Sequence, residues 1–151
     1  DVLGSRGLGD VYKRQSKYME NEYKKTKTTV SKIKYHFIFC TRYRRKIFDI
    51  PGVTEETEKL IQQKCAENQI EILHLECKKE YVYICVSTLP SMHIPEIVAY
   101  IKTSTSKKIR EEFEELSAMT SLWTRKYFVS TEETIDSHTI EWYVGSQKTR
   151  S

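Results

Sequence analysis

The sequence predicts an α+β fold of the ferredoxin-like, split βαβ kind, with an antiparallel sheet, helices on one face and a further C-terminal helix. Strand-like and helix-like segments alternate along the chain in the order β-α-β-β-α-β, with one more helix after them. The 151 residues, 38% of them hydrophobic, suffice for one core of ordinary size. With helices on one face only, the other face of the sheet is expected to be open for a ligand or partner. Many unrelated proteins share this fold, so the fold by itself does not identify a function.

The first strand is expected over residues 33–40, where the sequence reads IKYHFIFC, a run of β-branched and aromatic side chains. A basic turn over residues 41–46 follows it. Pro51 and Gly52 then interrupt the chain, and the next segment carries one apolar stripe as far as Asn68. We therefore expect a short amphipathic helix, with glutamates in its first turn and with Leu60, Ile61 and Cys65 on its buried side.

Two further strand-like runs, residues 70–77 and 81–87, are separated only by polar residues, which predicts a tight hairpin. Pro95 opens a longer helix, with an apolar face expected through Val98, Ile101, Ile109, Phe113 and Leu116. Residues 123–131 form another strand candidate. A last helix is expected to begin near Ser137 and to bury Ile140 and Val144.

The N-terminal segment differs in composition from the rest of the chain. Residues 1–18 are rich in glycine, show no periodicity and are interpreted as a non-native, adapter-like extension, with Met19 as the start of the protein. Residues 19–30 are polar and rich in lysine and threonine, which is typical of a flexible basic arm. The folded domain is therefore expected over residues 31–151.

Composition places the chain among ordinary globular proteins. No apolar run approaches the ~18 to 20 residues that cross a bilayer, so we expect no membrane association and a cytoplasmic location. The four cysteines, Cys40, Cys65, Cys77 and Cys85, form no C-x-x-C pair. We interpret them as reduced core residues.

Charge is distributed unevenly along the chain. Residues 16–50 contain ten lysines or arginines and three acidic residues, a surplus of seven, whereas residues 51–120 contain eight basic and twelve acidic residues. A concentrated positive patch attracts polyanions, and phosphates supply most of the affinity in nucleic-acid binding. The same composition also fits a solvated lysine-rich surface, so charge alone leaves both interpretations open.

Three segments carry more specific information when they are taken together. They are YHFIFCTRYRRKIF over residues 35–48, LWTRKYFVST over residues 122–131 and IEWYVGSQ over residues 140–147. In this order they resemble the small single-tyrosine transposases of the HUH class, of the kind encoded by the insertion sequence IS200 and its relatives. The resemblance spans roughly residues 22–148 and makes residues 31–151 a transposase-like, DNA-binding domain.

The resemblance implies a homodimer that binds a single-stranded DNA hairpin and cuts it by transesterification. In this chemistry a tyrosine attacks a phosphate and forms a covalent 5′-phosphotyrosine. A free phenol titrates near pH ~10, so the family uses Mg²⁺ or Mn²⁺ to stabilise charge on the phosphate. That metal is held by a His-hydrophobic-His strand and a glutamine.

Tyr143 falls at the position of the family's catalytic tyrosine, and Gln147 falls at that of its helical metal ligand. Residues four apart share one helix face, so both side chains are expected to address one phosphate. Tyr143 is alternatively a partly buried residue that attaches the last helix to the core.

Tyr81 and Tyr83 stand where the family has its two metal-binding histidines. Strand alternation puts both on one face, with Val82 and Ile84 on the other. A phenol must lose a proton before it binds a cation well, whereas a neutral imidazole offers its lone pair near pH 7. We therefore expect weak metal binding and impaired cleavage.

Two alternatives remain open. Glu76 and Glu80 offer oxygen ligands for a magnesium site rebuilt with Gln147, which would keep the transposase active. A ferredoxin-like domain with only a structural or protein-binding role would show no salt-dependent affinity for DNA. Among the histidines, the resemblance gives His36 a structural role.

Basic residues that follow the first strand are the candidate DNA-binding residues. Arginine side chains can form paired hydrogen bonds with phosphates, and the ring of Tyr43 among them offers a stacking surface for a base. The candidates are Arg42, Arg44, Arg45 and Lys46 of the basic turn, with Lys102 on the long helix extending the same surface.

Overall fold

The computed structural model describes residues 22–147, so the expected extension over residues 1–18 lies outside the described residues. The chain divides into two compact units, Asp1–Lys32 and Ile33–Ser151. The first unit contains a small hairpin in which β1 (Lys24–Lys25) pairs antiparallel with β2 (Val30–Ser31). A turn closed by a hydrogen bond from Thr26 N to Thr29 O, 2.8 Å long, joins the two strands. Part of the expected arm thus has local structure, and its flexibility stays a prediction.

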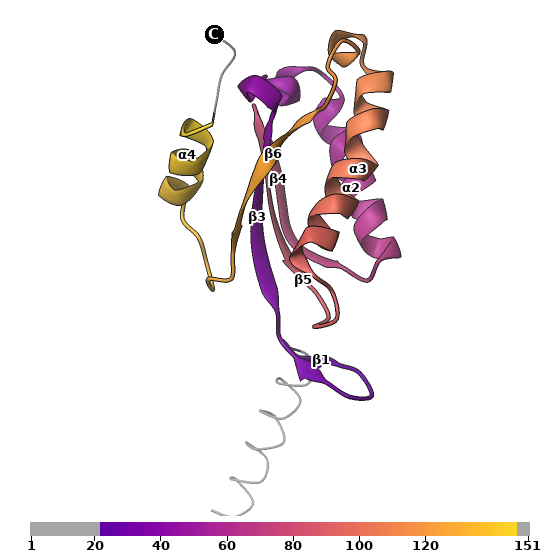
Figure 1. The fold of residues 1–151 in the computed structure, drawn as a ribbon, viewed down its shortest axis with the longest axis vertical. Coiled ribbons are helices and arrows are strands. Elements are labelled where there is room, and N and C mark those ends of the chain that lie inside the picture. The colour runs from indigo at the N-terminus through magenta and orange to yellow at the C-terminus, as the bar shows by residue number, and fades with distance from the viewer. Residues whose placement is uncertain (1–21, 148–151) are drawn as a thin grey trace, which may run out of the picture. The chain divides into compact units, whose positions relative to one another are not determined.

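The second unit is built on one four-stranded sheet (Figure 1). Its strands are ordered β4-β5-β3-β6, and every neighbouring pair is antiparallel. With the helices in place, the chain order is β-α-β-β-α-β followed by a helix, which is the ferredoxin-like arrangement predicted from the sequence. The strands are β3 (Lys34–Thr41), β4 (Glu71–Lys78), β5 (Tyr81–Ser87) and β6 (Trp123–Ser130).

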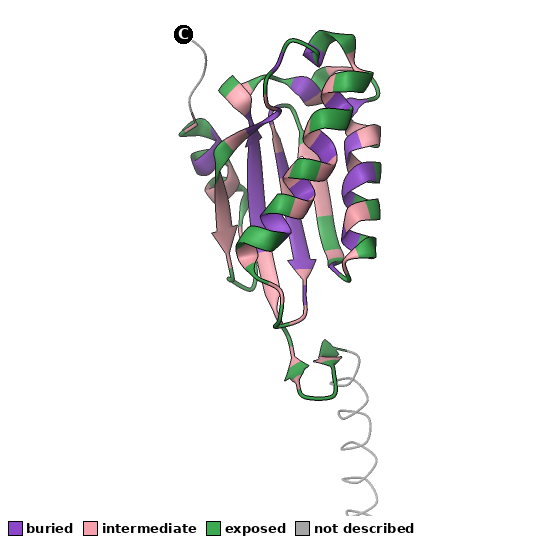
Figure 2. Ribbon diagram, turned by 45° about the vertical axis from the view of Figure 1, so that its right-hand side comes forward, coloured by how far each residue is buried: buried purple, intermediate pink, exposed green. Residues whose placement is uncertain are grey.

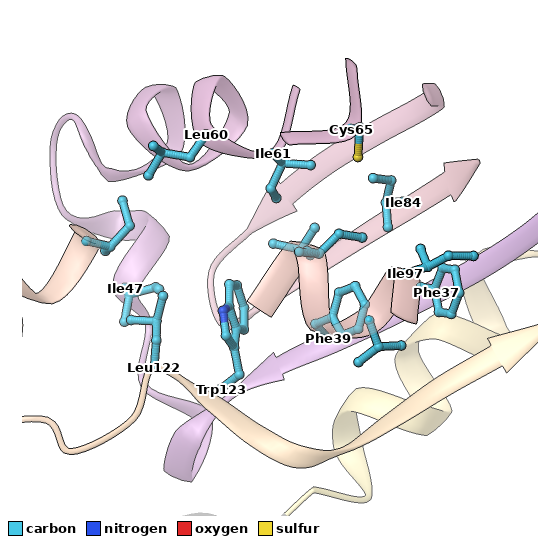
Figure 3. Packing of buried hydrophobic residues seen from close by; sticks show 14 of the residues in the cluster. Phe37, Phe39, Ile47, Leu60, Ile61, Cys65, Ile84, Ile97, Leu122 and Trp123 are labelled. Atoms are coloured by element: carbon cyan, nitrogen blue, oxygen red, sulfur yellow. The ribbon is translucent and has the colours of Figure 1, made fainter. Parts of the chain in front are cut away.

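Two helices, α2 (Val53–Glu67) and α3 (Ile94–Glu112), cover one face of this sheet, which we call the inner face (Figure 2). Alternation along the two central strands sends aromatic and β-branched side chains to this face. Together with the apolar stripes of the helices they form the main core, part of which is drawn in Figure 3. Its fully buried members include Phe37, Phe39, Ile61, Ile84, Ile97 and Ile101.

Both helices begin where the sequence predicts. Gly52 precedes α2 with a φ of 88°, a left-handed conformation that favours glycine, and a Cβ there would meet the ring of Phe113 at 3.4 Å. Pro95 lies in the first turn of α3. The end of α3 differs from the prediction, because Phe113 adopts an extended backbone and the apolar stripe continues in a 3₁₀ turn, Glu114–Leu116.

The opposite face of the sheet, the outer face, is not left open as predicted. The last helix, α4 (Ser137–Gly145), packs on it, on the other side of the sheet from α2 and α3 (Figure 1). Tyr143 and Val144 of α4 form a second, smaller core with Ile38 and Cys40 of β3. The apolar residues of α4 therefore cover part of this face within the same chain.

Within residues 22–147 no helix is both long and apolar enough to cross a membrane. The four cysteines are free thiols; Cys77 is half-buried and the other three are buried. Burial raises the pKa of the Cys40 thiol to about 12, with the Glu80 carboxylate adding to the shift. Three of the four cysteines therefore lie in the core, as the sequence predicts, and Cys77 packs at its edge.

Candidate functional site

The outer face of β5 carries two phenols, Tyr81 and Tyr83, which stand where the resemblance predicts metal-binding histidines. Tyr81 and Tyr83 pack against the small core under α4, while Val82 and Ile84 lie in the main core on the inner face. The alternation predicted from the sequence is therefore confirmed. Tyr81, Tyr83 and Tyr143 all lie on one face of the sheet because α4 docks there.

Tyr83 is held by a hydrogen bond to His36, which lies on β3 two residues before Ile38, the residue that pairs with Tyr83. The Tyr83 hydroxyl lies 2.8 Å from Nδ1 of His36, and Nε2 of His36 lies 2.7 Å from the carbonyl oxygen of Glu132. A carbonyl oxygen only accepts, so Nε2 carries a proton, and in the tautomer with a single ring proton Nδ1 accepts from the Tyr83 hydroxyl. His36 is 3% exposed, and these bonds give it the structural role that the sequence predicts.

A row of polar side chains continues from Tyr83 onto β4. The ring of His74 lies 5.5 Å from that of Tyr83, and its Nε2 is 3.7 Å from a carboxylate oxygen of Glu76. The other Glu76 oxygen is 2.8 Å from the ammonium of Lys78. This hydrogen bond from Lys78 is the main cause that lowers the pKa of Glu76. Glu76 is therefore ionised and already paired with a cation.

These residues do not fit a divalent cation. Burial raises the pKa values of Tyr81 and Tyr83, so both phenols keep their protons at neutral pH. The proton of Tyr83 is directed to His36, and the carboxylate of Glu80 lies 3.3 Å from a guanidinium nitrogen of Arg44. Within the part of the chain that the structure describes, no three His, Cys, Asp or Glu side chains are grouped to hold a metal ion.

Tyr143 is placed by the way in which α4 begins. Asp136 precedes the helix, and its carboxylate accepts a hydrogen bond of 2.9 Å from the backbone N–H of Thr139. Two turns later Tyr143 faces the sheet, and its ring centroid lies 5.5 Å from that of Phe128 on β6. Tyr143 is 6% exposed, less than the neighbouring Ile140, which is half-buried.

The hydroxyl of Tyr143 is buried and has no hydrogen-bond partner among the described residues. Burial raises its pKa to about 12, and the Cys40 thiol group contributes to the shift. In this arrangement the phenol is neutral and shielded from solvent, so it packs as an apolar side chain. A nucleophilic phenolate is strongly disfavoured here.

Gln147 follows α4 at its C-terminal end. Its side-chain nitrogen donates to the carbonyl oxygen of Tyr143 and to the hydroxyl of Ser146, each at 3.2 Å. The predicted spacing of four residues therefore brings Gln147 to the backbone of Tyr143. Its predicted role as a metal ligand stays a prediction.

The basic turn after β3 is tightly folded. Residues Arg42–Arg44 form a 3₁₀ turn in which Tyr43 and Arg44 have left-handed φ values of 59° and 55°. The turn is fastened by a hydrogen bond of 2.6 Å from the Thr41 hydroxyl to the carbonyl oxygen of Arg45. It separates the predicted DNA-binding residues into two groups, because Arg44 turns toward Glu80 while Arg45 and Lys46 are exposed.

Lys102 is directed inward from α3. Its ammonium donates to the carbonyl oxygens of Thr124 and Arg125, at 2.6 and 3.2 Å, and lies 5.6 Å from the ring centroid of Tyr127. Burial lowers its pKa. These contacts attach α3 to β6, and a contact of Lys102 with DNA stays a prediction.

Sequence reasoning missed the loop that faces the basic turn. Arg42 donates from its guanidinium to the Thr120 hydroxyl at 3.0 Å and from its backbone N–H to the Leu122 carbonyl at 3.0 Å. A pocket lies between the turn and this loop. The residues on its far side, Ala118, Met119 and Thr120, carry no charge or periodic pattern, so the sequence alone offers no signal for them.

Comparison with known proteins assigns a family to most of the chain. The family described as "Transposase IS200 like" matches residues 29–147. The ISDra2 transposase TnpA of Deinococcus radiodurans is 24% identical over 129 residues, which cover 83% of this chain and 91% of that protein. The transposase for insertion sequence element IS200 of Salmonella typhimurium is 26% identical over 101 residues, 65% of this chain and 66% of the relative.

Solved structures agree with the fold. The crystal structure of a candidate transposase from Deinococcus radiodurans matches with a TM-score of 0.74 and 26% identity, over 84% of this chain and 99% of that one. A REP-associated tyrosine transposase bound to a REP hairpin matches with a TM-score of 0.51 over 80% of this chain and 68% of that one. At 10% identity, this second match shows the fold alone.

Proposed function

This chain belongs to the family of IS200-like transposases, and from that membership we propose that it binds single-stranded hairpin DNA but cleaves it poorly. The family chemistry is DNA strand cleavage and transfer through a 5′-phosphotyrosine, with Tyr143 as the nucleophile. In this chain the proposal separates the two activities. DNA binding persists, while cleavage is impaired at the residues around the nucleophile.

The binding half of the proposal is supported by the basic turn and by one structural relative. Arg45 and Lys46 are exposed, and Arg42 is half-buried beside them. Arginine and lysine side chains placed together in this way suit a phosphate backbone. The REP-associated tyrosine transposase, which shares the fold, was solved with a DNA hairpin bound.

The impaired-cleavage half rests on one observation: the hydroxyl of Tyr83, at the position where the resemblance implies a metal-binding histidine, is hydrogen-bonded to Nδ1 of His36 at 2.8 Å. A neutral phenol that is already hydrogen-bonded is a poor ligand for Mg²⁺ or Mn²⁺. Charge stabilisation by a metal is worth several kcal/mol in phosphoryl transfer, and each ~1.4 kcal/mol changes a rate about tenfold. Its loss is expected to slow cleavage by at least about a hundredfold.

The two alternatives are less well supported. The carboxylates of Glu76 and Glu80, which would rebuild a magnesium site, each have a basic partner, Lys78 and Arg44. A metal would have to displace those partners. A purely structural or protein-binding role leaves the family membership and the basic turn unexplained.

The decisive experiment is a denaturing gel of hairpin DNA incubated with the protein and Mg²⁺ or Mn²⁺. We expect no protein-linked band from the unmodified chain. The double variant Tyr81→His with Tyr83→His is expected to gain metal binding and some covalent adduct. Adding Tyr143→Phe to that double variant should abolish the gain, which assigns the nucleophile.

Binding of the same hairpin, measured in parallel by fluorescence anisotropy, separates the two halves of the proposal. Binding without an adduct supports both halves. An adduct that the unmodified protein forms and that Tyr143→Phe removes would falsify the impaired-cleavage half and favour the carboxylate-metal alternative. Absence of salt-sensitive hairpin binding would refute the binding half.

We also propose that the protein acts as a homodimer, as the family resemblance implies. An uncovered outer face would be a further reason to expect a dimer, but α4 covers part of that face within the same chain. Exposed apolar side chains remain on the described surface, notably Trp142 of α4, which is 67% exposed. Sedimentation velocity at micromolar concentration tests the proposal, and a monomer there would contradict it.

A further inference from the structure

The helix that carries Tyr143 is held on the sheet by few apolar contacts. α4 buries two side chains, Tyr143 and Val144, whereas α2 and α3 bury five each. The burial of Tyr143 also has a cost, because its hydroxyl is buried without a partner among the described residues. The position of α4 therefore depends on more than apolar burial, and residues 131–136, which we call the α4 linker, join it to β6 (Figure 1).

The first half of the α4 linker is bound to the outer face of β3. Nε2 of His36 lies 2.7 Å from the carbonyl oxygen of Glu132. The ammonium of Lys34 donates to the carbonyl oxygen of Glu133 at 3.4 Å and to its carboxylate at 3.1 Å. The backbone N–H of Glu132 donates to the hydroxyl of Ser130 at 3.1 Å. Both backbone groups of Glu132 thus have partners, which fix the direction in which the chain leaves β6.

His36 is the stronger of the two contacts from β3. Its side chain is 3% exposed, whereas the side chains of Lys34 and Glu133 are 25% and 78% exposed. Water and salt weaken an exposed ion pair, so it contributes little. Loss of the buried hydrogen bond would instead leave polar groups unpaired in the interior. The position of the α4 linker therefore depends mainly on His36.

The ring of His36 is in turn oriented by Tyr83. The Tyr83 hydroxyl lies 2.8 Å from Nδ1 of His36. The hydrogen bond at one ring nitrogen decides which nitrogen carries the proton. A hydroxyl that donates to Nδ1 leaves the ring proton on Nε2, where the carbonyl oxygen of Glu132 needs a donor. Hydrogen bonds thus run from β5, through His36 of β3, to the α4 linker.

We propose that Tyr83 and His36 form a latch that keeps α4 on the sheet with Tyr143 buried, so that breaking the latch releases α4 and exposes the Tyr143 hydroxyl. Tyr83 is then a positioning residue, which acts on Tyr143 through the α4 linker. The resemblance gives position 83 to a metal ligand, and the latch is a different use of that position. The inference rests on the proposed function only in taking Tyr143 as the nucleophile.

Two measurements on the full chain without DNA test the latch. Hydrogen exchange followed by mass spectrometry reports the opening of residues 131–145. Nitration by tetranitromethane at mildly alkaline pH, mapped to single tyrosines, reports access to Tyr143. In the unmodified protein we expect Tyr143 to be protected, while Tyr23, which is 38% exposed, is nitrated and serves as the internal reference.

Variants of the latch should release α4. His36→Phe keeps a ring without its hydrogen bonds and should speed exchange in α4 and nitration of Tyr143 about tenfold or more, with exchange in α2 unchanged. His36→Gln, whose amide can still donate to Glu132, should keep part of the protection. Tyr83→Phe should have a smaller effect in the same direction. Combining Tyr83→Phe with His36→Phe should add nothing to His36→Phe alone, because both changes break the same series of hydrogen bonds.

Two control variants separate the latch from its surroundings. Tyr81→Phe removes a hydroxyl from the same face of the same strand, two residues before Tyr83, and should leave α4 unchanged. Lys34→Ala should release α4 less than His36→Phe does, because its ion pair with Glu133 is exposed.

Each outcome supports the latch or overturns it. Unchanged exchange and nitration in His36→Phe overturn it, and so does equal acceleration in α4 and α2, which would mean that His36 stabilises the whole fold. Effects of His36→Phe and Tyr83→Phe that add would show that the two residues act separately. If circular dichroism shows that His36→Phe is unfolded, Tyr83→Phe decides, because it must expose Tyr143 while Tyr81→Phe does not. Hairpin binding is measured separately, and its absence would refute the proposed function without changing these results.

Discussion

Two phenols on the outer face differ in their hydrogen bonding. Tyr83 donates to His36 at 2.8 Å, whereas the buried hydroxyl of Tyr143 has no partner among the described residues. A hydrogen bond of this kind contributes about 1 kcal/mol to stability, and a buried polar group without a partner costs about 1 to 3 kcal/mol. The same chemical change, tyrosine to phenylalanine, is therefore expected to have opposite effects at the two positions.

We predict that Tyr143→Phe raises the free energy of unfolding by about 1 kcal/mol and that Tyr83→Phe lowers it by about 1 kcal/mol. Urea denaturation at pH 7 measures both. The variants serve as controls for each other, because each removes one hydroxyl from the same face of the sheet. If Tyr143→Phe is the more destabilising of the two, Tyr143 does not occupy the buried position described above.

The pH dependence follows from the pKa of Tyr143, which burial raises from 10.0 to about 12. Between these values the unfolded chain loses the Tyr143 proton while the folded chain keeps it. Titration of Tyr143 therefore leaves the free energy of unfolding unchanged below pH ~10 and lowers it as the pH rises from ~10 toward ~12. Over that range Tyr143→Phe should lose stability less steeply than the unmodified protein.

Side-chain periodicity predicted the faces of β5 but not the partners of its residues. Alternation alone places Tyr81 and Tyr83 together, because a strand has a period of two. The burial of Tyr143 and the inward direction of Lys102 depend on how α4 and α3 pack on the sheet. Nothing in the neighbouring sequence distinguishes Lys102 from a solvent-exposed helix lysine, and its predicted contact with DNA stays a prediction.

At the scale of elements, α4 decides whether Tyr143 is buried or accessible. The helix has only nine residues, too few to be stable alone in water, so it depends on its cap and on its contact with the sheet. Asp136 is that cap, and its hydrogen bond from Thr139 N is the main cause that lowers the pKa of its carboxyl group. Its contribution is therefore present above the pKa of the unfolded state and is lost as the pH falls through the folded-state pKa.

We predict that Asp136→Ala weakens α4 without unfolding the sheet. Hydrogen exchange followed by mass spectrometry at neutral pH should show faster exchange over residues 137–145 and unchanged exchange in β3. Thr134→Ala, an exposed change in the same loop, serves as the control and should leave both regions unchanged. Equal acceleration in α4 and β3 would mean that the helix and the sheet unfold as one unit.

The elements themselves followed closely from the sequence. Every predicted strand and helix of the second unit exists, because apolar periodicity, Gly52 and Pro95 each act locally. The position of α4 on the outer face did not follow, because helix period shows which side of a helix is apolar but not which surface covers it. The 3₁₀ turn after α3 was also missed, since its apolar residues continue the helical stripe that precedes it.

For the whole molecule, the basic surplus of residues 16–50 becomes two kinds of positive charge in the structure. Some of it is used internally or in ion pairs, as in Arg44, which pairs with Glu80. Other positive charges are exposed, among them Arg45 and Lys46 of the basic turn. Only exposed charges of the second kind can replace the counterions of a DNA backbone.

This distinction predicts different salt dependences for residues that looked alike in the sequence. Each phosphate contact contributes about 0.7 to 0.9 to the slope of log affinity against log salt. Arg45→Ala and Lys46→Ala are therefore each expected to reduce the slope for hairpin binding by nearly one. Lys102→Met should leave the slope unchanged and instead destabilise the fold, because the carbonyl oxygens of Thr124 and Arg125 lose their donor.

Titrations of one hairpin between about 50 and 200 mM salt, at a temperature where every variant is folded, measure these slopes. Arg44→Ala is expected to lie between these two cases. The guanidinium of Arg44 must leave Glu80 before it can contact a phosphate. We expect a smaller reduction in slope for Arg44→Ala than for Arg45→Ala. A loss of slope in Lys102→Met as large as that in Arg45→Ala would show that Lys102 leaves its carbonyl partners to meet DNA, and the sequence-based assignment of that residue would then stand.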